Sequence, residues 1–71
     1  MQAKMTGFEL KTLRKQLGLS LAVASRQVET SVSTWCRWES GKQKIPLGAI
    51  KLFKLLNKTA ITKIDSPKNN V

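Results

Sequence analysis

The side chains with the most informative chemistry lie in a short segment that follows Ser31. Trp35 and Trp38 are three residues apart, the spacing of one buried helix face. The opposite, exposed face of such a helix then presents Val32, Ser33, Cys36 and Arg37. An exposed arginine can donate two hydrogen bonds to O6 and N7 of guanine, whereas a valine can pack only on a thymine methyl group. If this helix enters a DNA groove, these four side chains are the ones that reach nucleotide edges, with Arg37 as the main determinant of specificity.

Residues suited to catalysis or metal binding are scarce. The chain has no histidine, and its single cysteine, Cys36, can form neither an internal disulfide nor a Cys/His zinc site. A glycine-rich phosphate loop is absent, and only four carboxylates occur, of which Glu9 is expected to cap a helix. We therefore expect a protein that is not an enzyme and uses no metal or cofactor. Redox sensing by Cys36 is the less favoured reading of that residue.

The charge balance favours a polyanionic partner. Thirteen Lys and Arg residues against four Asp and Glu give a net charge of +9 in 71 residues. No run approaches the roughly 18 apolar residues of a membrane span, and the N-terminus lacks the apolar core of a signal peptide. We expect a soluble protein that binds double-stranded DNA. A cationic membrane-active amphipathic protein is the alternative from another class, which capped short helices and intervening glycines disfavour.

Capping signals divide the chain into short helices. Thr6, with Glu9 three residues later, predicts a capping box at the start of the first helix. Gly18 predicts its left-handed end. Its buried face carries Leu10, Leu13 and Leu17.

The next two helices are short and closely joined. Ser20 caps a helix of about two turns, with Leu21, Ala24 and Val28 on its inner face. Thr30 or Ser31 caps the helix that carries the tryptophans, and Gly41 ends it. Two short helices joined so tightly must cross steeply. This order is that of a helix-turn-helix, whose second helix braces against the DNA backbone while the third enters the major groove.

A fourth helix is predicted from about Leu47 to Leu56. Pro46 suits the first turn of this helix. Its apolar residues cover an arc of roughly 220°, more than one small core needs. We interpret the surplus, at Ile50 or Leu55 with part of the tail, as a self-association surface. Its polar stripe contains Lys51, Lys54 and Lys58.

Beyond Asn57 the helical spacing of apolar residues becomes less clear. Thr59 can cap a last short helix with Ile61 and Ile64 facing inward, and a strand over residues 60–64 is the alternative. The run 66–71 has nothing to bury and is expected to be a flexible tail.

Several landmarks together resemble the lambda-repressor-like family of phage Cro and repressor proteins over about residues 6–56. They are Leu13-Arg14, Gly18-Leu19-Ser20, Val28, Ser31, Thr34, Arg37 and Glu39-Ser40-Gly41-Lys42. The resemblance implies that Arg14 pairs with Glu39, which holds the arginine near a phosphate. It places base readout on Val32, Ser33, Cys36 and Arg37, and backbone contacts on Ser31, Arg14, Ser40, Lys42 and Lys44.

Three residues depart from the family pattern. Leu21 replaces the glutamine that usually starts the second helix, so its DNA contact is expected to be missing. Ser25 stands where a small alanine lies at the helix crossing. Glu29 replaces the turn glycine. If Glu29 adopts the left-handed conformation, the strain costs on the order of 1 kcal/mol; otherwise the turn has a different shape.

Each assignment has a simpler alternative. Trp35 and Trp38 could stack on bases, although their spacing favours the core. The polar stripe of the fourth helix is interpreted as solvated charge. For Arg37 the alternative to base readout is a phosphate contact. For Lys42 and Lys44 the alternative to phosphate contact is a charge that only keeps the protein in solution. Arg14 and Glu39 could be two independent surface charges.

Together these features predict an all-α domain of four to five helices over residues 1–65, with the helix-turn-helix at about 20–40. Within its family the chain looks most like a temperate phage Cro, because 71 residues leave no room for a large oligomerisation domain. We expect a homodimeric repressor of pseudo-palindromic operators in the cytoplasm of a bacterial host. An antitoxin or restriction-controller regulator of the same fold is the alternative.

Overall fold

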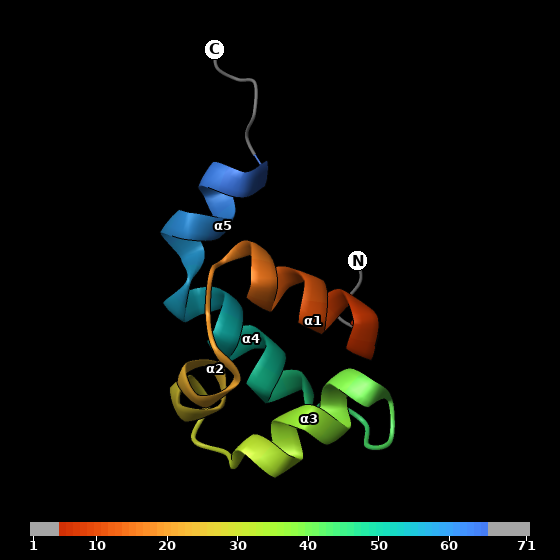
Figure 1. Cartoon of the computed structure of the whole chain (residues 1–71). Helices are drawn as coiled ribbons and strands as arrows, with labels where there is room; N and C mark the ends of the chain where they lie inside the picture. The colour runs from red at the N-terminus through yellow and green to blue at the C-terminus, as the bar shows by residue number, and fades with distance from the viewer. Residues whose placement is uncertain (1–4, 66–71) are drawn as a thin grey trace.

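Five α-helices make up the described part of the chain. The computed structural model describes residues 5–65, with side chains through Thr62, and contains no strand in that range. The helices are α1 (Gly7–Gln16), α2 (Leu21–Gln27), α3 (Val32–Ser40), α4 (Leu47–Leu56) and α5 (Lys58–Asp65), as Figure 1 shows. The predicted all-α class is therefore confirmed. No helix among these residues is long and apolar enough to cross a bilayer, and the predicted flexible tail at 66–71 lies outside them.

Hydroxyl caps fix the starts of the first three helices. The Thr6 hydroxyl accepts from the Glu9 amide at 3.0 Å, and the Glu9 carboxylate accepts from the Thr6 amide at 2.9 Å. This is the predicted capping box. Ser20 and Ser31 each accept from the amide three residues later at 3.1 Å. Ser31, not Thr30, is therefore the cap of α3.

Left-handed residues end the same three helices. Gly18 has φ +72° and Gly41 φ +82°, as predicted, and Glu29 adopts φ +56° after α2. After Glu29, the Thr30 amide donates to the Ser25 carbonyl at 3.0 Å. This is the hydrogen bond that closes the last helical turn when glycine is the left-handed residue. The turn between α2 and α3 thus keeps its compact form without glycine, at a cost of about 1 kcal/mol.

The core takes at least one side chain from each of the first four helices. Leu10, Ala24, Trp35, Trp38 and Phe53 form its buried cluster. The Trp35 ring lies 5.7 Å from that of Trp38 and meets the Phe53 ring edge-on at 5.1 Å, measured between centroids. Aromatic packing of this kind fixes the rotation of α3 about its own axis, because both indoles must point inward.

Gly7 allows α1 to lie against the end of α3. A β-carbon at Gly7 would overlap the carbonyl oxygens of Trp38 and Glu39. The first turn of α1 therefore contacts the last turn of α3 directly. This close approach positions the rest of α1, including Arg14, beside the C-terminal end of α3.

The burial of α4 corrects one prediction. Ile50 is buried, so its placement at the exposed edge of the helix is wrong. It faces a cavity that it shares with Met5 and Ile45, from the chain before α1 and the α3–α4 connection. Leu55, the other predicted edge residue, is exposed. Pro46 is the N-cap and precedes the first turn of α4.

The start of α5 corrects a second prediction. Because α5 begins at Lys58, Thr59 lies inside its first turn and does not cap it, and the strand alternative is also wrong. Asn57 separates α4 from α5, and its carbonyl accepts from the Ile61 amide at 2.9 Å. Its side-chain amide donates to Gln27 at 2.8 Å, which ties this junction to α2. The predicted inward side chain of Ile64 is outside the described residues.

Candidate DNA-binding surface

Helices α2 and α3, with the turn over residues 28–31, form a helix-turn-helix. In Figure 1, α2 is seen nearly end-on while α3 runs across the view, so the two cross steeply, as predicted. Ser25 is buried, and its hydroxyl donates to the Ala22 carbonyl at 3.1 Å. Leu21 packs against the core. A small satisfied side chain at Ser25 thus lets the two helices approach closely.

The outward face of α3 carries the four predicted base-reading residues. Trp35 and Trp38 are 1% and 4% exposed, as predicted. In contrast, the residues on the other side of the helix are all exposed: Val32, Ser33, Cys36 and Arg37. They occupy positions i, i+1, i+4 and i+5, so they share one surface about 7.5 Å long. This surface has the dimensions and side-chain types of a helix that enters the major groove.

A hydrogen-bonded network joins α1 to the end of α3. The Arg14 Nε atom donates to Oε2 of Glu39 at 2.7 Å, and Nη2 donates to Oε1 at 3.3 Å. Both side chains are about nine-tenths buried, at 10% and 9% exposure. Arg14 Nη1 also donates to the Leu19 carbonyl at 3.0 Å. The expected Arg14–Glu39 pair is present as a two-pronged ion pair anchored to the α1–α2 connection.

Trp35 belongs to this network, which the sequence reasoning missed. Its indole Nε1 donates to Oε2 of Glu39 at 2.6 Å. The signal was available, because Trp35 and Glu39 are four residues apart on one helix and therefore adjacent on its surface. Glu39 thus accepts hydrogen bonds from a core indole of its own helix and from Arg14 of α1, so it ties α3 to α1.

The environment of Glu39 favours its ionised form. Although burial raises the pKa of this carboxyl, hydrogen bonds from Arg14 and Trp35 and the positive charges of Arg14 and Lys11 outweigh that effect. The pKa of Glu39 is therefore lowered from its ordinary value of 4.5. The ion pair is complete at neutral pH.

The predicted backbone-contacting residues differ in how free their donors are. The Ser31 hydroxyl donates to Oγ1 of Thr34 at 3.0 Å, and the Ser40 hydroxyl donates to the Arg37 carbonyl at 3.2 Å. Each hydroxyl would have to exchange that bond to donate to a phosphate. Arg14 has two guanidinium N–H groups left after its three bonds. Lys42 and Lys44 are exposed as well, and each carries an ammonium group with three N–H donors.

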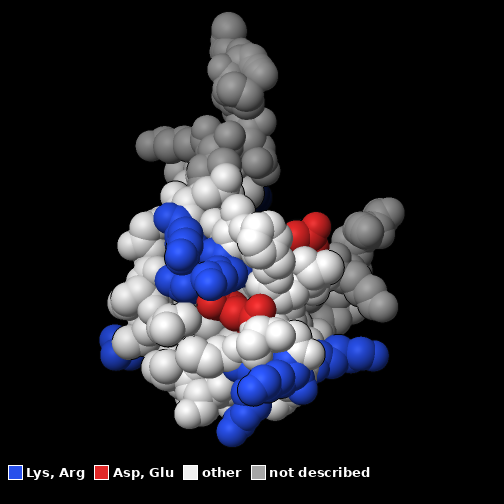
Figure 2. Space-filling view, turned by 45° about the vertical axis from the view of Figure 1, so that its right-hand side comes forward, with Lys and Arg blue, Asp and Glu red and all other residues white. Residues whose placement is uncertain are grey.

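Charge on the surface is divided into separate groups. Figure 2 shows Lys and Arg side chains in distinct clusters, with acidic atoms between two of them. Lys42 and Lys44 follow α3 directly, whereas Lys51 and Lys54 belong to α4. A phosphate backbone laid along α3 would therefore meet the lysines of the α3–α4 connection.

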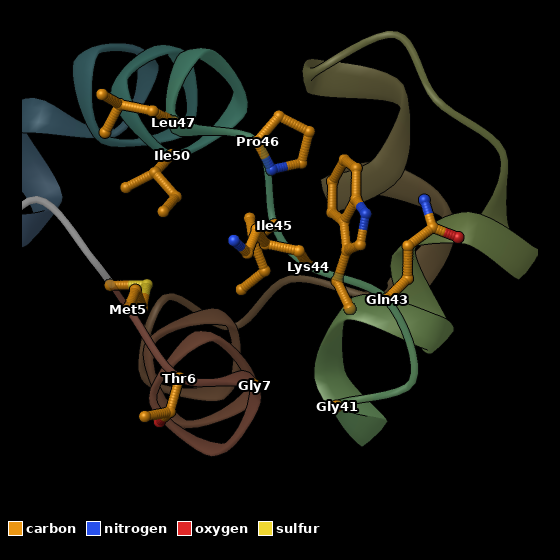
Figure 3. A pocket seen from close by; sticks show the side chains of 11 residues that line it. Met5, Thr6, Gly7, Gly41, Gln43, Lys44, Ile45, Pro46, Leu47 and Ile50 are labelled. Atoms are coloured by element: carbon orange, nitrogen blue, oxygen red, sulfur yellow. The ribbon is translucent and has the colours of Figure 1, made fainter.

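A cavity of about 660 Å³ lies beside this connection. Figure 3 shows Met5, Ile45, Leu47 and Ile50 around it, from the chain before α1, the connection and α4. Lys44 is the only ionisable residue in its lining, so the cavity offers no acid–base pair. Among the described residues, no group of three or more His, Cys, Asp or Glu could hold a metal ion.

The fold and this surface define a small all-α domain with a helix-turn-helix. The family model of the helix-turn-helix domain matches residues 7–53, from the start of α1 to the middle of α4. The chain belongs to this family of DNA-binding domains. No curated protein and no solved structure matches the chain significantly.

Proposed function

We propose that the protein is a sequence-specific transcriptional repressor of the phage Cro type, which binds operator DNA and occludes RNA polymerase. The observation that carries the proposal is the orientation of α3. Both tryptophans are in the core, and the opposite face is free along its length. An exposed helix of this kind fits the major groove, which is about 12 Å wide. The protein acts by binding and not by catalysis.

Base readout belongs to the exposed face of α3. Arg37 makes a bidentate contact with guanine, worth about 1–3 kcal/mol of discrimination. Val32, at the start of the helix, packs on a thymine methyl group, and Ser33 and Cys36 line the same groove. The network of Arg14, Trp35 and Glu39 holds this face at a fixed angle to the rest of the domain.

Backbone contacts position the domain on DNA. Lys42 and Lys44 meet phosphates that flank the groove, because they are exposed just beyond the end of α3. Ser31 and Ser40 contribute when their hydroxyls turn from their intrachain bonds toward phosphate. Arg14 is mostly buried, and the two guanidinium N–H groups that it has left are the donors it can offer to a phosphate.

Two copies bind one operator as a dimer, at least on DNA. In a two-fold arrangement the recognition helices lie about 34 Å apart, one turn of B-DNA. The operator is then an approximate palindrome. The proposed setting is the cytoplasm of a bacterial host. The family match and the charge of +9 support the DNA-binding part of the proposal.

Selection of bound duplexes from a random pool tests the proposal. We expect an enriched motif with two inverted half-sites separated by about one helical turn. The same experiment at increasing salt measures the phosphate contribution. If the dimer neutralises about six to ten phosphates, affinity falls by about 10³ to 10⁵ between 50 and 200 mM salt. A pool that stays random, with affinity that does not depend on salt, contradicts the proposal.

A pair of substitutions separates the two kinds of contact. Arg37→Ala should relax base preference at one position of each half-site, whereas Lys42→Ala should weaken binding to all sequences alike. Lys54→Ala is the matched control, because Lys54 is an exposed lysine outside the proposed surface. If Arg37→Ala and Lys42→Ala behave identically, the division of roles is wrong.

A further inference from the structure

A row of exposed leucines on α4 is not used by the proposed DNA contacts. Leu52, Leu55 and Leu56 are all exposed, and Leu55 reaches 66%. With Gly48 they occupy positions i, i+4, i+7 and i+8 on the exposed side of α4. We call these four residues the α4 leucine stripe. Single exposed leucines are common, but a helical row of them marks a contact surface.

The charge beside this stripe has one sign. On the helical wheel Lys51 lies next to Leu55, and Lys54 lies further round the same edge. Both lysines are exposed, as is Lys58 at the start of α5. From residue 47 to residue 62 the sequence has no Asp or Glu. A partner that covers the leucines therefore gains most if it carries carboxylates along one edge.

Gly48 indicates what shape of partner fits. No atom lies within 4 Å of the position its β-carbon would take, so the α4 backbone is open there. A second helix can approach closely at such a point and place its own side chains between the leucines. Peptide helices that dock in this way use apolar anchors at i, i+4 and i+7.

We propose that the α4 leucine stripe docks an acidic amphipathic α-helix of a partner protein. The stripe extends about 12 Å along α4, which suits two to three turns of the partner. Apolar side chains of that helix cover Leu52 and Leu55, and its carboxylates lie toward Lys51 and Lys54. This inference does not rest on the proposed repressor function, because none of these residues belongs to the DNA-binding surface.

Two other occupants fit the stripe less well. A second copy of the chain is the occupant that the sequence predicted for Leu55, but it would bring the same Lys51 and Lys54 to this interface, where like charges repel. An anionic lipid surface would attract Lys51 and Lys54 but would gain nothing from the open backbone at Gly48. Charge and shape together therefore favour the acidic helix.

Titration of the isotope-labelled full chain with a synthetic peptide tests the proposal. The peptide has roughly 14 residues, with leucines at i, i+4 and i+7 and glutamates along one edge. We expect amide shifts in α4 around Gly48 and Leu55, with little change in α3. Leu55→Gln should weaken peptide binding by about tenfold or more. Val32→Gln, which changes an exposed apolar residue on α3, should not weaken it.

A charge exchange makes the test specific. Lys51→Glu with Lys54→Glu should weaken the glutamate peptide by about two- to tenfold and should strengthen a peptide in which lysines replace the glutamates. A peptide with the same glutamates but no leucines should leave α4 unchanged. Equal binding of both charged peptides, shifts outside α4 or no binding overturns the proposal.

The same variant decides between occupants. If Leu55→Gln abolishes self-association of the peptide-free chain in sedimentation, the stripe is an interface between copies. If it abolishes binding to phosphatidylglycerol vesicles, the stripe binds lipid. Either result overturns the proposal, and DNA affinity measured in parallel reports separately on the repressor function.

Discussion

Replacing Glu39 with glutamine removes one charge from the network between α1 and α3 while keeping its shape. In the wild-type chain the carboxylate accepts from Arg14 and Trp35. Glutamine can still accept through its carbonyl oxygen, but the Arg14 charge then stays buried without an opposite charge. The substitution therefore measures what the ion pair contributes to the free energy of unfolding.

Burial sets the expected size of the effect. Exposed ion pairs contribute about 0.2–1 kcal/mol, whereas loss of one partner from a buried pair costs about 3–5 kcal/mol. The Arg14 and Glu39 side chains are about nine-tenths buried. Because Arg14 keeps its bond to the Leu19 carbonyl, we expect a loss of about 2–4 kcal/mol. A domain of 71 residues has a total stability of about 4–10 kcal/mol, so this is a large share.

Urea denaturation followed by tryptophan fluorescence gives the measurement, since Trp35 and Trp38 are buried in the native state. The midpoint of thermal unfolding should fall by roughly 10–25 °C. Arg14→Met and the double variant complete a double-mutant cycle. We expect the double variant to lose about 1–3 kcal/mol less than the sum of the single variants. A loss below about 0.5 kcal/mol for Glu39→Gln, with additive behaviour in the cycle, refutes the reasoning.

Three further predictions follow from the same geometry. The lowered pKa of Glu39 means that the unfolded chain binds its proton more readily, so the stability from Glu39 is complete above about pH 4.5 and is lost as pH falls through the folded pKa. Urea midpoints at a series of pH values should show this loss in the wild type and a smaller one in Glu39→Gln. Glu29→Gly should raise stability by about 0.5 kcal/mol, because it relieves a left-handed glutamate at some cost in chain entropy, whereas Glu29→Gln should not. A gain of equal size in Glu29→Gln would assign the effect to charge. Gly7→Ala should destabilise the domain by about 2 kcal/mol or more, since its β-carbon overlaps two carbonyl oxygens of α3, while Gly48→Ala meets open space. Calorimetry that finds Gly7→Ala neutral would show that α1 does not lie against α3 in this way.

Much of the fold is predictable because its signals are local. Thr6, Ser20 and Ser31 cap helices through bonds that span three residues, and Gly18 and Gly41 adopt conformations that favour glycine. The inward turn of Trp35 and Trp38 could be predicted because their spacing puts both large apolar side chains on one face of an amphipathic helix. The pairing of Arg14 with Glu39 is different, because 25 residues separate the two and only the family resemblance suggested it.

The missed features depend on tertiary contacts. Ile50 lies within a very wide apolar arc, and spacing cannot say which part of such an arc faces the core. Thr59 has the chemistry of a cap, but α5 begins at Lys58. The Ile61 amide donates to the Asn57 carbonyl, which places Thr59 inside the first turn. The Trp35–Glu39 bond requires a particular rotation of the indole, which its packing against Phe53 sets.

Alkylation of Cys36 tests most directly whether the outward face of α3 contacts DNA. Cys36 is exposed on that face and is the only cysteine in the chain. We expect a maleimide to react readily with the free protein and at least about tenfold more slowly when a selected duplex saturates it, as groove contact excludes the reagent. In the control, Cys36→Ser with Leu55→Cys places the thiol on α4, where DNA should not slow the reaction. Unchanged reactivity of Cys36 on saturating DNA, with protection of the thiol on α4, would contradict the account.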